Sequence, residues 1–248
     1  MTNSKGAVQA QSAGIWLLYV VSCLWLGIAL VWWSYSRIDY GYGFWYDQLD
    51  IGNHIRQYAS RHPVRHDFAR LSKDQHLRAF ESISHAVHNH GEGLTEISFS
   101  TPEGTSVHLL DRAEVLHLQD VAKLINWSAR ASLVCLFFWL GSLFYFYRQP
   151  LPPWRFRVGI SLGLAITVSV LLVVAGPRDV FYQMHIWVFP PEHQWFFYWE
   201  QSLMSCLMKA PDLFGGIAVV LAGIGLPVAL LLYRTGLQAT AVLARRRF

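Results

Sequence analysis

Cysteine and charged residues are both scarce in this sequence of 248 residues. The three cysteines, Cys23, Cys135 and Cys206, are scattered, so they form neither a CxxC metal pair nor a disulfide framework. Charged residues make up 15% of the chain, whereas about a quarter is usual in soluble domains. The sequence also lacks a glycine-rich phosphate loop and a GxSxG elbow, so a nucleophilic role for Ser202 is unsupported. These absences argue against cysteine chemistry, phosphate-loop nucleotide binding and serine hydrolysis.

The few charges leave long apolar windows. No Asp, Glu, Lys or Arg occurs from residue 6 to residue 36, and a bilayer core needs about 20 such residues. The windows 131–147, 158–177 and 213–233 are equally free of these residues. The first window is too long, and too rich in tryptophan near its end, for a cleaved signal peptide. We therefore predict a mainly α membrane protein with a bundle of four transmembrane helices.

Basic residues mark the cytoplasmic ends of these windows. Arginines gather between the second and third windows and after the fourth, and Lys5 precedes the first. The positive-inside rule makes these three segments cytoplasmic. We read the basic tail as this topology signal, so no nucleic-acid partner is expected. The predicted helices are 1–36 (with the cytoplasmic N-terminus), 131–147, 158–177 and 213–233. The predicted outer parts are a domain at 37–130 and a segment at 178–212. The predicted cytoplasmic parts are a loop at 148–157 and a tail at 234–248.

The first outer segment has the patterns of a small α+β domain. Residues 71–91 predict a helix with Ser72 as its N-cap. Residues 94–110 alternate like two short strands about a P-E-G turn. Asp111 can cap the next helix, with Glu114 three residues later completing a capping box. The second outer segment is rich in aromatic residues but too polar at intervals for a fifth span, which predicts an interfacial lid before the last helix.

The stretch AEVLHLQDV, residues 113–121, places His117 three residues after Glu114 and three before Asp120. On a helix, either carboxylate can hold one imidazole nitrogen and prepare the other as a general base. The alternative is a solvated helix face with polar pairs and no chemistry.

A second histidine, His185, lies among large apolar residues in FYQMHIWVFPP, residues 181–191. Burial there would keep it neutral, and Glu200 is a rare acid in the same aromatic segment and a candidate partner. The alternative is an interfacial histidine that anchors a loop. Two outer histidines at separate positions in the sequence could converge on one site.

Three further histidines, His85, His88 and His90, lie close together in the sequence. No HExxH motif or cysteine partner accompanies them. We therefore favour a polar cluster at a helix end, and predict no metal and no cofactor.

Three stretches resemble motifs of the bacterial lipoprotein intramolecular transacylase family of integral membrane proteins. Residues 113–125 look like the family's acidic–x–x–His–x–x–Asp–Val helix, residues 181–189 like its second histidine motif, and residues 195–214 like the segment before its last span. The chain departs from typical members in its histidine-rich stretch 54–90 and in YWEQ at 198–201.

The resemblance implies transfer of the sn-2 acyl chain of a diacylglyceryl-cysteine lipoprotein to the α-amine of the same cysteine, in the bacterial cytoplasmic membrane. It implies that His117 and His185 are catalytic, on the extracytoplasmic side. Candidate supporting residues are Glu114, Asp120 and Glu200, and candidate substrate-binding residues are Trp187, Trp195 and Arg178. The expected partners are membrane phospholipid and a diacylated lipoprotein, whereas the oligomeric state is not determined.

Two other classes of function remain open from the sequence. A non-enzymatic envelope sensor or accessory protein could use the histidine-rich outer domain to respond to pH or metal. A transporter is disfavoured, because the four predicted spans carry few ionisable groups.

Overall fold

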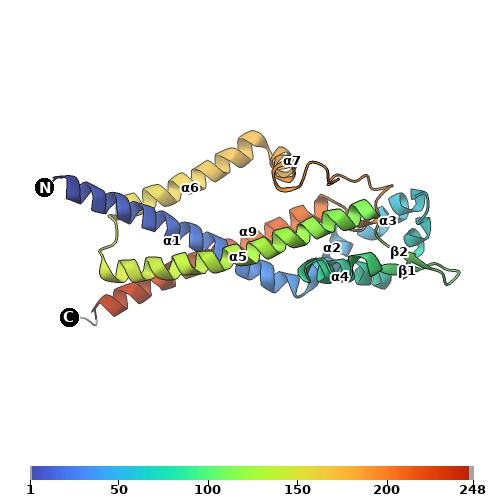
Figure 1. Ribbon diagram of the computed structural model, residues 1–248, viewed down its shortest axis with the longest axis horizontal. Coiled ribbons are helices and arrows are strands. Elements are labelled where there is room, and N and C mark those ends of the chain that lie inside the picture. The colour runs from blue at the N-terminus through green and yellow to red at the C-terminus, as the bar shows by residue number, and fades with distance from the viewer. Residues whose placement is uncertain (1, 246–248) are drawn as a thin grey trace. The chain divides into compact units, whose positions relative to one another are not determined.

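The computed structural model describes the backbone of residues 2–245. Within this range, the side chains at 2–10, 168–169, 171–172, 177–178 and 243–245 are outside the description. The chain forms two compact units, which we describe separately (Figure 1). The first comprises Met1–Val31, Arg130–Met184 and Leu221–Phe248, and the second comprises Trp32–Ala129 and His185–Val220.

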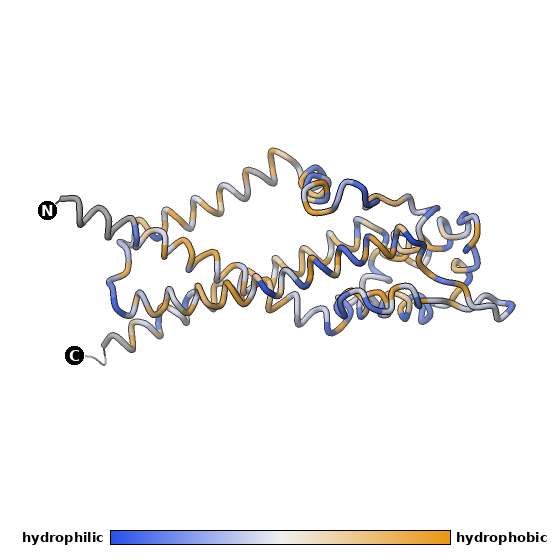
Figure 2. The backbone as a smooth tube through the Cα atoms, viewed as in Figure 1, coloured by the Kyte–Doolittle hydropathy of each residue, from blue (hydrophilic) through white to orange (hydrophobic). Residues whose placement is uncertain are grey.

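Among the described residues, three helices are long and apolar enough to cross a membrane. They lie within α1 (Thr2–Ser36), α5 (Arg112–Arg148) and α9 (Asp212–Arg245), and Figure 2 shows their long hydrophobic stretches. The predicted third span falls on α6 (Trp154–Ala175), a helix of 22 residues. Because several α6 side chains lie outside the described set, the count of four spans stays a prediction.

The N-terminal half of α5 is polar, unlike the rest of the helix. Five charged residues occur before its apolar stretch: Arg112, Glu114, Asp120, Lys123 and Arg130. After Arg130, no Asp, Glu, Lys or Arg follows until Arg148. A bilayer core accommodates about 20 helical residues, so a helix of 37 residues extends beyond it. The part of α5 that suits the membrane interior is thus 131–147, and His117 lies outside it.

The core of the first unit is aromatic. Trp16 and Tyr19 of α1 pack with Phe146 of α5, and the Tyr19 hydroxyl donates a hydrogen bond to the Tyr233 carbonyl at 2.6 Å. Further along α1, a Cβ at Gly27 would lie 2.6 Å from the Ala229 backbone nitrogen of α9. Small residues allow this close helix crossing where no side chain would fit.

The second unit contains the mixed α+β structure. Its elements are the end of α1, η1 (Asp39–Gly41), α2 (Tyr42–Gln48), α3 (Ile51–Tyr58), η2 (Ala59–Arg61), η3 (His66–Arg70), α4 (Lys73–His88), η4 (Leu94–Glu96), β1 (Ser98–Ser100), β2 (Ser106–His108), the first part of α5, the end of α7 (Pro177–Val188), α8 (Leu203–Leu207) and the start of α9.

Local patterns in this unit are confirmed. Ser72 accepts a hydrogen bond from the Gln75 backbone nitrogen, and the Gln75 side chain accepts one from the Ser72 backbone, which completes a capping box at the start of α4. Strands β1 and β2 pair antiparallel with Phe99 opposite Val107. Each of these features joins residues a few positions apart, so the sequence alone specifies them.

The buried histidine His54 predicts how the stability of this unit depends on pH. Its ring packs against Tyr58 and Trp199, with centroids 4.6 and 4.5 Å away. Burial, aided by the Lys209 charge, lowers the pKa of His54 to about 4. The unfolded chain therefore binds a proton at higher pH than the folded chain, so stability is complete above about pH 6.5 and is lost as the pH falls toward 4.

We expect the free energy of unfolding to fall by about 2 kcal/mol through His54 alone between about pH 8 and about pH 5. Unfolding should be measured across this range for the native chain and for His54→Phe, which fills the same space without titrating. His62 and His76 also have pKa values lowered by burial, so part of the loss remains in the variant. Identical pH dependence in both proteins would show that His54 plays no part.

Candidate active site

His117 lies in the polar half of α5 with its ring against aromatic side chains. The centroids of Phe189 and Phe197 are 4.9 and 5.7 Å from the imidazole. Its Nδ1 atom is buried and has no hydrogen-bond partner among the described residues. A buried polar atom without a partner is costly and therefore uncommon, which makes this nitrogen a candidate contact for a ligand.

His185, near the end of α7, shares one of these aromatic neighbours. Its ring stacks on Phe189 at 5.2 Å with an interplanar angle of 27°, and contacts Trp195 at 5.1 Å. The two histidines, from sequence segments on either side of α6, therefore pack against the same phenyl ring. Both histidines belong to the second unit, where they lie close together as the sequence led us to expect.

The protonation of His117 follows from this environment. Burial is the main cause that lowers the pKa of its imidazole to about 4. The nearby His185 also lowers this pKa, and the opposing effect of the Asp120 carboxylate is smaller. The ring is therefore neutral at physiological pH. A neutral imidazole can accept a proton, which is the property required of a general base.

Asp120 binds a histidine that the sequence patterns did not indicate. His193 Nδ1 donates to Asp120 Oδ2 at 2.5 Å, and Lys123 Nζ donates to Oδ1 at 2.7 Å. Burial alone would raise the pKa of Asp120, but these two partners hold it below its usual range. The interpretation that Asp120 orients His117 by a direct hydrogen bond is thus replaced: Asp120 anchors the 189–197 segment, which carries two of the rings around His117.

Glu114 has a different role from the one its spacing suggested. Its Oε1 accepts hydrogen bonds from Ser202 Oγ at 2.6 Å and from the Met204 backbone nitrogen at 3.0 Å. Its Oε2 accepts one from the Asp111 backbone nitrogen at 2.7 Å, which is the predicted capping contact, and lies 3.5 Å from Arg65 Nη1. The prediction that Glu114 orients His117 is wrong, because both oxygens are committed to this buried network.

The remaining predicted site residues lie in different surroundings. Trp195 contacts His185 directly, whereas the Trp187 side chain is 79% exposed. The Glu200 carboxylate lies at the surface, 3.8 Å from Arg61 Nη1, which makes Arg61 its partner in place of the His185 expected from the sequence. The Arg178 side chain lies outside the described residues, so its predicted role stays a prediction.

His193 could not be found by spacing alone. It follows the pair Pro190–Pro191 in a segment without regular structure, where no helical period relates it to other residues. Its partner Asp120 is 73 positions away in the sequence. Only the tertiary fold brings the two side chains together.

Comparison with solved structures relates the chain to a known fold. Two structures of the membrane-integral lipoprotein intramolecular transacylase Lit from Bacillus cereus, each with one histidine mutated, match the chain. One is 12% identical with a TM-score of 0.62, over 99% of this chain and 96% of that one. The other is 13% identical with a TM-score of 0.61, over 99% and 98% of the two chains.

No protein-family model matches the sequence, and no curated protein matches it significantly. The likeness in structure covers nearly the whole chain at low sequence identity. It confirms, for the fold, the resemblance carried by the three motifs.

Proposed function

We propose that this chain, which has the fold of a lipoprotein intramolecular transacylase, is an integral-membrane acyltransferase of the bacterial cytoplasmic membrane. Its substrate would be a lipoprotein with a diacylglyceryl group on its N-terminal cysteine. The observation that supports this most directly is the pair His117 and His185 on one phenyl ring, with the buried His117 neutral and its Nδ1 without a hydrogen-bond partner among the described residues.

The proposed reaction moves the sn-2 acyl chain to the α-amine of the same cysteine. The neutral amine attacks the ester carbonyl, a C–N bond forms, and the amine proton passes to the neutral His117. The C–O bond to the glyceryl group then breaks, and the imidazolium returns the proton to the leaving oxygen. Acting first as base and then as acid, one histidine serves both steps, which is worth about 10²–10⁴ in rate.

His185 is the second proposed catalytic group. It shares Phe189 with His117 and lies close enough for its charge to affect the His117 pKa. The N–H of its imidazole can donate a hydrogen bond to the ester oxygen as negative charge develops there. This role leaves His117 as the group that carries the proton.

The aromatic surroundings suit a folded lipid substrate. The amine and the sn-2 carbonyl belong to one molecule, so the reaction closes a medium-sized ring that forms slowly in free solution. Orientation of two such groups can contribute up to about 7–11 kcal/mol. Phe189, Trp195 and Phe197 surround the histidines with apolar surface, which favours acyl chains and excludes water.

A cellular experiment tests the reaction class. The chain should be expressed in a bacterial host whose lipoproteins keep a free N-terminal amine, and a lipoprotein N-terminal peptide should then be analysed by tandem mass spectrometry. We expect an unchanged peptide mass with one acyl chain moved to the amine. A lipid pattern identical to that of the host without the chain would overturn the proposal.

The contact between His193 and Asp120 leads to a prediction about positioning. Replacing His193 with alanine frees the 189–197 segment from α5, so the rings around His117 lose their placement. We expect kcat for acyl transfer to fall about 10–100-fold, since a displacement near 1 Å can cost this much. The measurement is the rate of amide formation with purified protein.

Two further variants separate positioning from a general loss of structure. Glu192→Ala changes an exposed neighbour and should leave the rate unaltered. Asp120→Ala should reproduce the loss, and combining it with His193→Ala should add little, because both remove the same contact. Additive losses in the double variant would show that the two residues act separately.

A further inference from the structure

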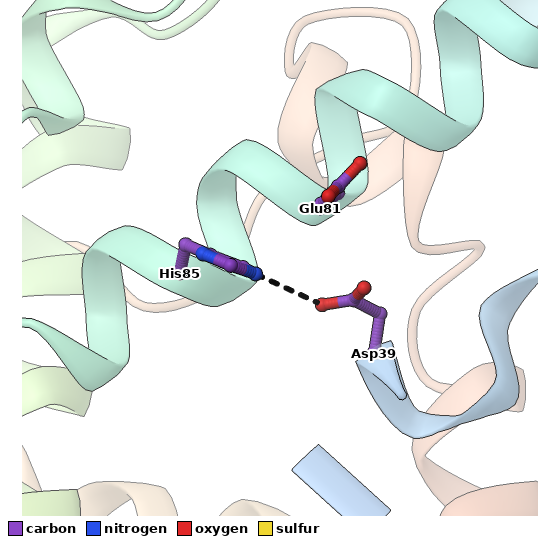
Figure 3. Close-up of side chains that lie close together, drawn as sticks. All are labelled: Asp39, Glu81 and His85. Carbon is purple, nitrogen blue, oxygen red and sulfur yellow. Dashed lines mark ion pairs between the residues drawn. The ribbon is translucent and has the colours of Figure 1, made fainter. Parts of the chain in front are cut away.

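Three side chains that can ligate metals meet on the surface of the second unit, apart from the two histidines on Phe189. Asp39 lies in η1, just after α1, while Glu81 and His85 lie one turn apart on α4. One ligand atom from each residue lies within 4.8 Å of the other two. Figure 3 shows the three side chains close together, with the ion pair between His85 and Asp39 marked.

The backbone around Asp39 holds its carboxylate in this position. Asp39, Tyr40 and Gly41 have φ values of 48°, 54° and 62°, a run of left-handed residues. Such a conformation is unfavourable for residues with a side chain and persists only where the surrounding structure enforces it. The result is a carboxylate turned toward the exposed face of α4.

One Asp39 oxygen is left without a hydrogen bond. Oδ1 is buried and has no hydrogen-bond partner among the described residues, and His85 Nε2 lies 4.0 Å from it. A carboxylate oxygen removed from water normally accepts a hydrogen bond or binds a cation. This unsatisfied oxygen is the observation that points to a ligand.

Neighbouring histidines are engaged elsewhere, which leaves His85 as the imidazole of the cluster. His88 contacts the Tyr40 hydroxyl through Nε2 at 3.0 Å and the Ser84 carbonyl through Nδ1 at 2.9 Å. His90 Nδ1 pairs with the Asn126 amide at 2.9 Å. The histidine cluster noted in the sequence is thus divided among three different environments.

We propose that Asp39, Glu81 and His85 bind a divalent transition-metal ion of the Zn²⁺ class, with water completing the coordination. Two carboxylates and one imidazole form a ligand set suited to Zn²⁺ and its neighbours in the first transition series. Closing the ligands to about 2.0–2.2 Å from the metal needs small rotations of Glu81 and His85. The side chain of His85 is 73% exposed, so it can rotate without disturbing the core.

The bound ion would join the chain segment after α1 to α4. The Tyr40–His88 hydrogen bond already links the same two segments a turn away, so the metal would reinforce an existing contact. Because metal binds the folded state, it would stabilise the second unit in proportion to ln(1 + [metal]/Kd). This site is independent of the proposed acyl transfer.

Zn²⁺ itself and Co²⁺, which reports its coordination by visible absorption, are the probes. Full-length, tag-free protein in detergent should be titrated by calorimetry with Zn²⁺ and by absorption with Co²⁺. We expect one site per chain and a higher unfolding temperature with Zn²⁺. His85→Ala and Glu81→Gln should each weaken Zn²⁺ binding at least about tenfold, since even residues that merely support ligands contribute that much.

His108→Ala is the matched control, because it removes an exposed histidine outside the cluster. It should bind Zn²⁺ as tightly as the native chain does. Asp39→Asn keeps a residue that tolerates left-handed backbone and should also weaken binding. Absence of binding at about 100-fold excess of Zn²⁺ over protein, or equal affinity in the native chain and His85→Ala, would overturn the assignment.

Discussion

Replacing His117 with alanine is expected to reduce kcat for acyl transfer by about 10²–10⁴, with little change in KM. The imidazole is the proposed carrier of the proton between the attacking amine and the leaving glyceryl oxygen. Phe189 and Phe197 surround it, so alanine leaves an apolar space that cannot accept a proton. Substrate binding through the acyl chains does not require the imidazole, and KM should therefore be retained.

The rate is measured as amide formed per unit time with purified protein and a synthetic diacylated lipopeptide. His108→Ala, at an exposed position on β2, controls for the loss of any histidine and should keep the native rate. The unfolding temperature of His117→Ala is measured alongside, because the variant loses the packing of the ring against Phe189 and Phe197, and the rates are compared at a temperature where both proteins are folded. A variant with native kcat would remove His117 from the reaction.

Replacing Glu114 with alanine is expected to reduce the free energy of unfolding by about 3–5 kcal/mol, the usual effect of breaking a buried charged pair. Its carboxylate is fully buried, and it holds Ser202 and the Met204 backbone nitrogen. Arg65, whose side chain is 11% exposed, would lose a carboxylate neighbour. Alanine would therefore leave several buried polar groups unpaired at once.

Denaturant unfolding of the native chain and three variants tests this expectation. Glu114→Gln keeps the size and the acceptor oxygen but loses the charge beside Arg65, so it should be intermediate between Glu114→Ala and the native chain. Ser202→Ala removes one hydrogen bond and should cost about 1 kcal/mol. Equal stability of Glu114→Ala and the native chain would contradict the structural role assigned to this residue.

Features determined by neighbouring residues were predictable from the sequence. The Ser72 cap, the paired strands and the contact between Asp111 and Glu114 each involve residues within about ten positions, and their patterns reflect that short range. Three of the apolar windows likewise correspond to helices long and apolar enough to cross a membrane.

Features determined by distant residues were not predictable in the same way. The spacing of Glu114, His117 and Asp120 correctly placed three polar side chains near one another on α5, but it could not show what approaches them from elsewhere. Ser202, 88 positions from Glu114, and His193, 73 positions from Asp120, bind those carboxylates instead. A carboxylate bonds whichever donor the tertiary fold brings within reach, and no pattern within α5 specifies that donor.

The most direct test of the central proposal is an isotope-crossover experiment with the purified protein. Two lipopeptides of different peptide mass are mixed, one with deuterated acyl chains and one with ordinary chains, and the products are analysed by tandem mass spectrometry. If His117 and His185 catalyse intramolecular transfer, every N-acyl chain will carry the isotope of its own glyceryl group. Products with exchanged isotopes, or peptides whose amines stay free, would contradict it.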